Sequence, residues 1–128
     1  MKIVKDILEQ KGHQVWSIAP DATVYEALKV MGEREVGALT VVDGGSLVGI
    51  ISERDYARKV ILRGKTSRET RVREIMTAAV VTTSPDQTVE ECMATMTERR
   101  IRHLPVIERG RMVGMVSIGD LVKSIIAE

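Results

Sequence analysis

The sequence predicts an α+β fold of two tandem, pseudo-symmetric β-α-β-β-α repeats packed sheet to sheet, each with a short helical lead-in. The first observation is internal repetition. Shifted by 65 residues (85 − 20), segment 20–24 aligns with 85–89, and 48–55 aligns with 113–120. The second is that apolar spacing changes from helix-like to strand-like at the same point of each copy. The third is length, because half of a 128-residue chain is marginal alone, whereas two halves together bury a real core.

The lead-ins and the first strands open each copy. Segments 4–8 and 72–76 resemble each other and predict short helices, and 15–18 and 80–82 predict the first strands. The distance from the first residue of the lead-in to the threonine that begins the next helix is 19 residues (23 − 4) in copy one and 16 (88 − 72) in copy two. Copy one therefore carries three extra residues, which we place near residues 11–13.

A helix follows in each copy. Thr23 with Glu26, and Thr88 with Glu91, form the capping-box pattern that satisfies unpaired amides at a helix start. Apolar residues then recur at helical spacing, which predicts helices over 23–35 and 88–100. Their buried faces comprise Val24, Ala27, Leu28 and Met31 in copy one, and Val89, Cys92, Met93 and Met96 in copy two.

A hairpin and a second helix complete each copy. Strands are predicted at 38–42 and 47–51, and again at 103–107 and 112–116, with turns that need positive φ between them. The second helices are predicted from Tyr56, Val60 and Ile61, and from Leu121, Val122, Ile125 and Ile126. Segment 63–68 is a polar linker. We therefore divide the chain into repeat one with its lead-in, residues 1–66, and linker with repeat two, residues 67–128.

The composition is that of an ordinary globular protein. A net charge of +1 and three aromatic residues argue against a nucleic-acid binder. No run approaches the roughly 18 apolar residues of a membrane-spanning helix. A single cysteine, Cys92, and no secretory signal lead us to expect a cytoplasmic protein.

The repeated motifs resemble those of a known family. Paired units with P-D-x-T-V and V-G-h-h-S-x-x-D, where h is apolar, and a central L-P-V in copy two, are similar to the CBS-domain pair, or Bateman module, of bacterial stand-alone type. The resemblance covers nearly the whole chain. It implies regulatory binding of adenine nucleotides in clefts between the two repeats, and a homodimer formed through exposed helix faces.

Each copy carries Ser-x-x-Asp where an apolar strand turns into a helix: Ser52 with Asp55, and Ser117 with Asp120. One interpretation is a second capping box. The other is a ligand site, because a helix N-terminus attracts phosphate and a carboxylate can accept two hydrogen bonds from a ribose diol. The two are compatible. The resemblance implies that the aspartate binds ribose and the serine lies beside it.

The copies differ most where their second strand begins. Copy two has Arg102 and His103 where copy one has Gly37 and Ala38. Arginine clamps phosphate and histidine adds a donor that charges near neutral pH. The resemblance implies that Arg102 and His103, with Arg100 nearby, complete the cleft of Ser52 and Asp55. The alternatives are a solvated cationic helix end and a surface histidine.

The resemblance also places the adenine in an apolar slot along the first strand. For the Asp55 cleft, this slot comprises Trp16, Ser17, Ile18 and Ala19. Trp16 could stack on the base, or serve packing or an oligomer contact. The second cleft, with Thr82, Thr83, Ser117 and Asp120, is expected to be empty, weaker or used by a different ligand.

We therefore expect a regulatory sensor of adenine nucleotides that acts through conformational or oligomeric change. AMP is favoured, and ADP, ATP or NAD(H) are further candidates, which makes the sensor one of energy or redox state. The alternative is a ligand-independent protein–protein interaction module. No base–nucleophile pair or metal-ligand spacing occurs, so we expect no enzyme and no catalytic cofactor. The expected partners are a second copy of the chain and an unidentified regulated protein.

Overall fold

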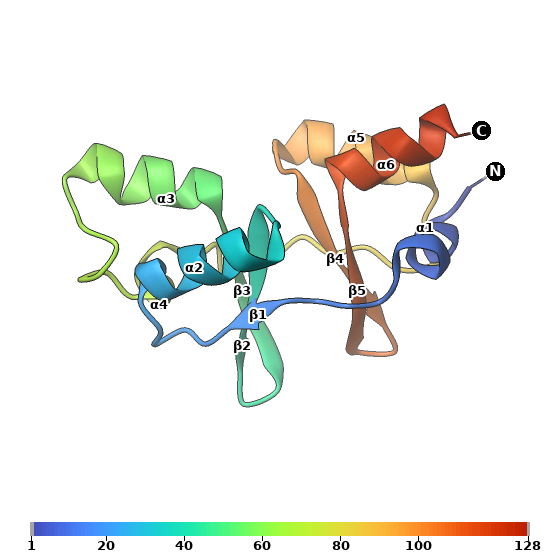
Figure 1. The fold of residues 1–128 in the computed structure, drawn as a ribbon. Helices are drawn as coiled ribbons and strands as arrows, with labels where there is room; N and C mark the ends of the chain where they lie inside the picture. Colours follow the sequence, from blue (N-terminus) through green and yellow to red (C-terminus); the bar gives the residue numbers. More distant parts are fainter. Residues whose placement is uncertain (1, 128) are drawn as a thin grey trace. The chain divides into compact units, whose positions relative to one another are not determined.

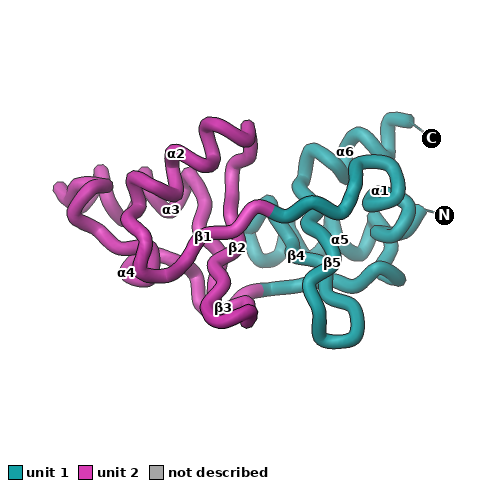
Figure 2. The backbone as a smooth tube through the Cα atoms, turned by 60° about the horizontal axis from the view of Figure 1, so that its bottom comes forward, with its two compact units in different colours: residues 1–15, 81–128 teal, residues 16–80 magenta. Residues whose placement is uncertain are grey.

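The computed structural model describes residues 2–127 and confirms the α+β class (Figure 1). The chain divides into two compact units, coloured separately in Figure 2. Unit 1 comprises residues 1–15 with 81–128, and unit 2 comprises residues 16–80. Within the described range, no helix is long and apolar enough to cross a membrane.

Unit 2 contains the first repeat with the second lead-in. Its three-stranded sheet has the order β1-β2-β3, with β1 parallel to β2 and β2 antiparallel to β3. Its elements are β1 (Ser17–Ile18), α2 (Val24–Arg34), β2 (Ala38–Asp43), β3 (Ser46–Ser52), α3 (Glu53–Lys59), a 3₁₀ turn (Ile61–Arg63) and α4 (Val72–Ile75).

Unit 1 contains the second repeat with the first lead-in. Its sheet is the antiparallel pair β4-β5. Its elements are α1 (Val4–Lys11), α5 (Val89–Arg99), β4 (His103–Glu108), β5 (Arg111–Ser117) and α6 (Ile118–Ile126).

The predicted helix starts and hairpin turns are confirmed. Thr23 Oγ1 accepts from Glu26 N at 3.1 Å, and Thr88 Oγ1 accepts from Glu91 N at 3.0 Å. The turns between hairpin strands hold positive φ, for example 83° at Gly45 and 76° at Gly110. Each unit has its own apolar core, in which Met31 and Met96 are buried, and Cys92 is buried as predicted from the helix face.

The predicted first strand of copy two, 80–82, is wrong. Unit 1 has only a single parallel bridge there, between Thr83 and Val106. In unit 2, Thr40 N donates to Trp16 O at 3.3 Å. The residue aligned with Thr40 is Pro105, which has no N–H to donate, so the ladder cannot extend toward residue 81.

The compact units do not share the boundaries of the repeats. Helix α1 contacts β5 and α6 of repeat two, and α4 contacts β3 and α3 of repeat one (Figure 1). The division at 66/67 thus separates the sequence repeats, while each lead-in packs on the other repeat. The segment predicted as a linker also belongs to unit 2, where Tyr25 N donates to Ser67 O at 2.9 Å.

The glycine of each V-G pair makes this packing possible. A Cβ at Gly114 would lie 2.6 Å from Leu8 Cδ2, and a Cβ at Gly49 would lie 2.6 Å from Met76 Sδ. Each lead-in therefore lays an apolar side chain directly over the strand backbone, where only glycine leaves room.

Candidate functional site

The Ser-x-x-Asp motif occupies the same place in both units, at the junction of the last strand and the last helix. Ser52 Oγ accepts from Asp55 N at 3.2 Å, and Ser52 N donates to Asp55 Oδ2 at 2.9 Å. Ser117 and Asp120 repeat this arrangement at 3.2 and 2.8 Å. The predicted capping boxes are thus confirmed. A carboxylate offers about four acceptor positions, so capping leaves capacity for a ligand.

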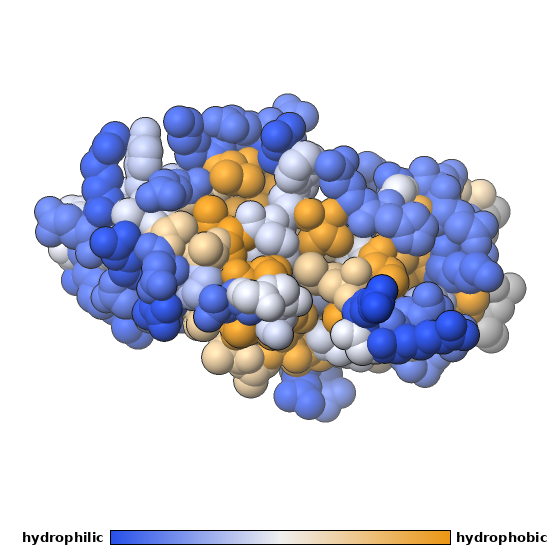
Figure 3. Space-filling view, turned by 90° about the horizontal axis from the view of Figure 1, so that it is seen from below, coloured by the Kyte–Doolittle hydropathy of each residue, from blue (hydrophilic) through white to orange (hydrophobic). Residues whose placement is uncertain are grey.

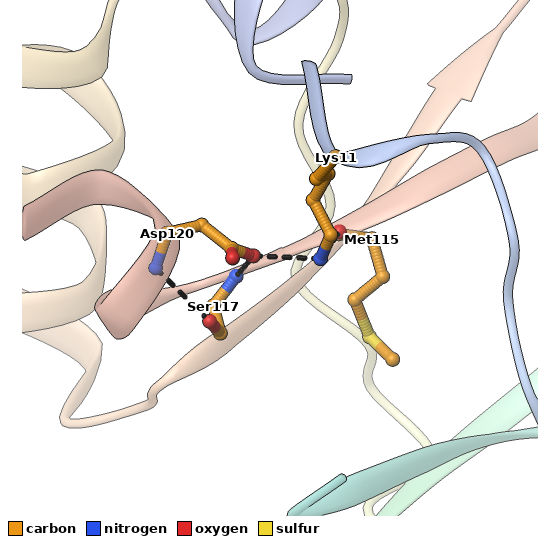
Figure 4. A network of polar contacts seen from close by, with 4 residues as sticks. All are labelled: Lys11, Met115, Ser117 and Asp120. Atoms are coloured by element: carbon orange, nitrogen blue, oxygen red, sulfur yellow. Dashed lines mark hydrogen bonds and ion pairs between the residues drawn. The ribbon is translucent and has the colours of Figure 1, made fainter. Parts of the chain in front are cut away.

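A lysine that the sequence analysis missed lies against each aspartate. Lys59 Nζ lies 3.1 Å from Asp55 Oδ1 and donates to Ile75 O at 2.9 Å. Its spacing of four residues along a helix was a usable signal. The Asp120 carboxylate instead receives Lys11 Nζ at 2.7 Å, across 109 residues of sequence (Figure 4). No local pattern predicts that contact.

The pKa values of Asp120 and His103 are both lowered, but for different reasons. Burial would raise the pKa of Asp120, but the Lys11 ammonium and the Ser117 N–H outweigh it and lower that pKa. Burial lowers the pKa of His103. The Asp120 charge opposes this shift, and Lys11 and Arg102 add to it. The His103 imidazole is therefore neutral at pH 7.

The predicted cations of copy two lie in unit 1, beside its own Ser-x-x-Asp motif. His103 begins β4 and is paired in register with Ser117, and Ile118 N donates to Arg102 O at 2.9 Å. Arg100 ends α5 in the left-handed conformation, with φ of 56°. The predicted pairing of Arg102 and His103 with Ser52 and Asp55 joins the two units, and stays a prediction.

In unit 2 the aligned positions carry no charge. Ala38 is paired in register with Ser52, and Glu53 N donates to Gly37 O at 3.1 Å. The backbone is therefore the same in both units at this point, and the chemical difference rests on the side chains alone.

The predicted adenine slot lies along β1 of unit 2. Trp16 is half-buried, and the Arg34 guanidinium lies 4.0 Å from its ring centroid. One face of the indole is thus covered by a cation–π contact, in keeping with the packing alternative. Ser17 Oγ lies 2.6 Å from Thr40 Oγ1, Ile18 is half-buried and Ala19 is exposed.

Thr82 and Thr83, which were predicted to line the second, weaker cleft, differ in their exposure and contacts. Thr82 is exposed, whereas Thr83 Oγ1 lies 3.4 Å from Cys92 Sγ. Burial raises the pKa of the Cys92 thiol, which disfavours the reactive thiolate form. Among residues 2–127, no three His, Cys, Asp or Glu side chains gather in a way that could hold a metal ion.

A tandem pair of units, each with a strand hairpin, two helices and this strand–helix motif, is typical of a class of regulatory module. The family model described as the CBS domain matches residues 4–62 and again 72–127. The chain belongs to the CBS-domain family and carries two copies of the domain.

Three relatives show the range of the likeness. The CBS domain-containing protein CBSX3, mitochondrial, of Arabidopsis thaliana is 44% identical over 98% of this chain, which spans 65% of the relative's length. A solved protein with CBS domains from Burkholderia ambifaria is 51% identical, with a TM-score of 0.97 over 99% of this chain and 96% of that one.

The third relative contains ligands. The CBS domain pair of protein MJ0100 was solved with 5′-methylthioadenosine and S-adenosyl-L-methionine. It is 29% identical, with a TM-score of 0.88 over 99% of this chain and 98% of that one.

Proposed function

We propose that this chain is a regulatory module that binds an adenosyl compound, with AMP favoured, through the Ser52–Asp55 motif. The observation that carries the proposal is the Asp55 carboxylate, whose Oδ2 accepts hydrogen bonds from Ser52 N at 2.9 Å and Ser52 Oγ at 3.1 Å and is thereby fixed at the start of α3. Such a carboxylate can accept both hydroxyls of a ribose. The adenosyl ligands of the MJ0100 pair support the ligand class.

The proposal assigns the phosphate to Arg102 and His103. Arginine gives a bidentate clamp and a neutral imidazole donates one hydrogen bond, which together favour a nucleotide over an uncharged adenosine. AMP, ADP or ATP would make the module an energy sensor, and NAD(H) would make it a redox sensor. The residues from Trp16 to Ala19 would line the base, and stacking on the indole face that Arg34 covers would require Arg34 to move away.

The output would pass through oligomer state or a bound protein, because the proposal includes no catalytic role. Apolar side chains on the outer faces support a homodimer: Ile61, Leu62, Val122, Ile125 and Ile126 are exposed. Figure 3 shows the molecule from below, where hydrophobic residues lie at the surface among hydrophilic ones. The five exposed apolar side chains named above equally favour the second candidate, an interaction module that needs no ligand. A single cysteine, Cys92, with no partner for an internal disulfide is in keeping with a cytoplasmic location.

Thermal unfolding with added ligands tests the proposal. AMP, ADP, ATP, NAD, NADH and S-adenosylmethionine are compared on protein freed of copurified nucleotide. A ligand at about 100 times its Kd adds about 2.7 kcal/mol, which raises Tm by several degrees. We expect the rise to vanish in Asp55→Asn, which keeps the side-chain shape, and to survive in the matched variant Asp120→Asn. No rise with any ligand would leave the interaction module as the better function.

A further inference from the structure

The three-residue extension of the first lead-in has a structural consequence that the proposed function does not use. Helix α1 runs to Lys11, whereas α4 ends at Ile75. Seven residues after Val4 stands Lys11, and seven after Val72 stands Ala79. Only the first lead-in therefore carries a long cationic side chain at this position.

The extension also changes how the edge of the last strand is covered. In unit 2, Ile50 and Thr77 exchange backbone hydrogen bonds of 3.0 and 2.9 Å. The residue aligned with Ile50 is Met115, and its carbonyl accepts from Lys11 Nζ at 2.9 Å. His13 Nδ1 lies 2.9 Å from Val113 O, two residues earlier on the strand. Side chains of the extension thus replace a backbone bridge along β5.

This placement brings the Lys11 ammonium onto the Asp120 carboxylate. Figure 4 shows the ammonium on the side of the carboxylate that faces away from α6. The oxygen Oδ2 accepts from Lys11 Nζ at 2.7 Å and from Ser117 N at 2.8 Å. Charge-assisted bonds of this length are strong, and Lys11 is held by acceptors from two elements, β5 and α6.

The lysine at Asp55 is held differently. Lys59 lies one turn along the same helix as Asp55 and lies against Oδ1 rather than the capped Oδ2, at 3.1 Å. The residue aligned with Lys59 is Ser124, which is buried in unit 1. The two aspartates therefore receive their lysines from different elements: Asp55 from its own helix, and Asp120 from a segment remote in sequence.

We propose that Lys11 is a built-in occupant of the Asp120 carboxylate and competes there with the ribose of an adenosyl ligand. A neutral diol can use this carboxylate only by displacing an ammonium that also bonds to Met115 O. The chain then binds one adenosyl ligand tightly, at the Asp55 motif, and a second only weakly. This inference rests on the proposed function and extends it to ligand stoichiometry.

Calorimetric titration with 5′-methylthioadenosine tests the proposal, because this probe has a ribose but no phosphate to attract Lys11. We expect one ligand per chain in the native protein. In Lys11→Met we expect a second ligand, bound on the order of tenfold more tightly than at the native Asp120 position. Lys5→Met is the matched control, since it removes the same charge from an exposed position of the same helix. The double variant Lys11→Met/Asp120→Asn should return to one ligand.

Three results would overturn the inference while leaving the proposed function intact. The first is native protein that binds two ligands equally, each lost with its own aspartate. The second is Lys11→Met that binds 5′-methylthioadenosine as the native chain does. The third is Lys11→Met that, in a parallel titration, loses AMP but keeps 5′-methylthioadenosine, which would make Lys11 a phosphate ligand. Absence of binding in every variant would instead remove the adenosyl function itself, and this inference with it.

The strength of the Lys11–Asp120 ion pair can also be measured without any ligand. In a double-mutant cycle on urea unfolding, Lys11→Met and Asp120→Asn should be coupled, because each removes the same contact. Additive effects would mean that Lys11 does not hold Asp120 in solution, and would overturn the inference directly.

Discussion

His103 carries a pH dependence that follows from its surroundings. Its pKa lies below the ordinary 6.5 because the ring is buried in unit 1, beside Lys11 and Arg102, with Asp120 in partial opposition. A group whose pKa is lower in the folded state contributes stability above its unfolded pKa, and that stability is lost as pH falls toward the folded pKa. Protonation of His103 therefore works against folding below about pH 6.5.

We expect the free energy of unfolding to fall more steeply from pH 7.5 to 5.5 in the native chain than in His103→Gln. The difference is bounded by about 1.4 kcal/mol per pH unit for one proton. Urea unfolding at both pH values measures it, with His13→Gln, an exposed histidine, as the control. A His103 pKa above 6.5 by NMR titration would contradict this account.

At the scale of elements, each lead-in and the strand beneath it form one packing unit. Gly49→Ala places a methyl group 2.6 Å from Met76 Sδ, so we expect a loss of about 1–3 kcal/mol in the free energy of unfolding. Gly114→Ala should behave in the same way against Leu8. Shortening the opposing side chain, as in Gly49→Ala/Met76→Ala, should recover part of the loss.

The control is a glycine with open space around it. Gly32 lies inside α2, and a Cβ there meets nothing within 4 Å. Gly32→Ala should stabilise the chain by roughly 0.5–1 kcal/mol through helix propensity. Equal destabilisation at positions 32 and 49, measured by urea unfolding, would show that close approach of the lead-in is not the reason for the strand glycine.

Elements whose signals are local could be predicted from the sequence. Thr88 and Glu91 lie three residues apart, so the start of α5 could be recognised without knowing the rest of the chain. The absence of a strand at 80–82 could not be predicted from that segment itself. It depends on Pro105 in the neighbouring strand, which has no N–H to donate to residue 81. Lys11 could not either, because the carboxylate it binds lies 109 residues away. The sequence predicted that the two Ser-x-x-Asp motifs differ through the cations Arg102 and His103, but it missed the Lys11 contact that distinguishes Asp120 from Asp55.

At the scale of the whole molecule, each repeat depends on the lead-in of the other for its core. Leu8 is 1% exposed and belongs to the core of unit 1, although it precedes repeat one in sequence. Leu8→Ala should cost about 2–5 kcal/mol. Hydrogen exchange should show the loss of protection in β4, β5 and α6, within repeat two.

Met76→Ala provides the reciprocal test. Met76 packs against the core of unit 2 and precedes repeat two in sequence. We expect its exchange effects in β2 and β3, within repeat one. If either substitution affected mainly the repeat that follows it in sequence, the assignment of lead-ins to units would be wrong.

The placement of α1 determines when this helix can dock during synthesis of the chain. The segment 16–80 emerges as one continuous stretch that contains all of unit 2, whereas α1 has its partners in residues 81–128. At translation rates of 5–20 residues per second, the roughly 100 residues between Lys11 and Asp120 take about 5–20 seconds to appear. During that time Val4, Ile7 and Leu8 have no core to enter. Helix α1 is therefore synthesised before its partners and can dock only after β5 and α6 have emerged, so its apolar face stays uncovered in the nascent chain until then.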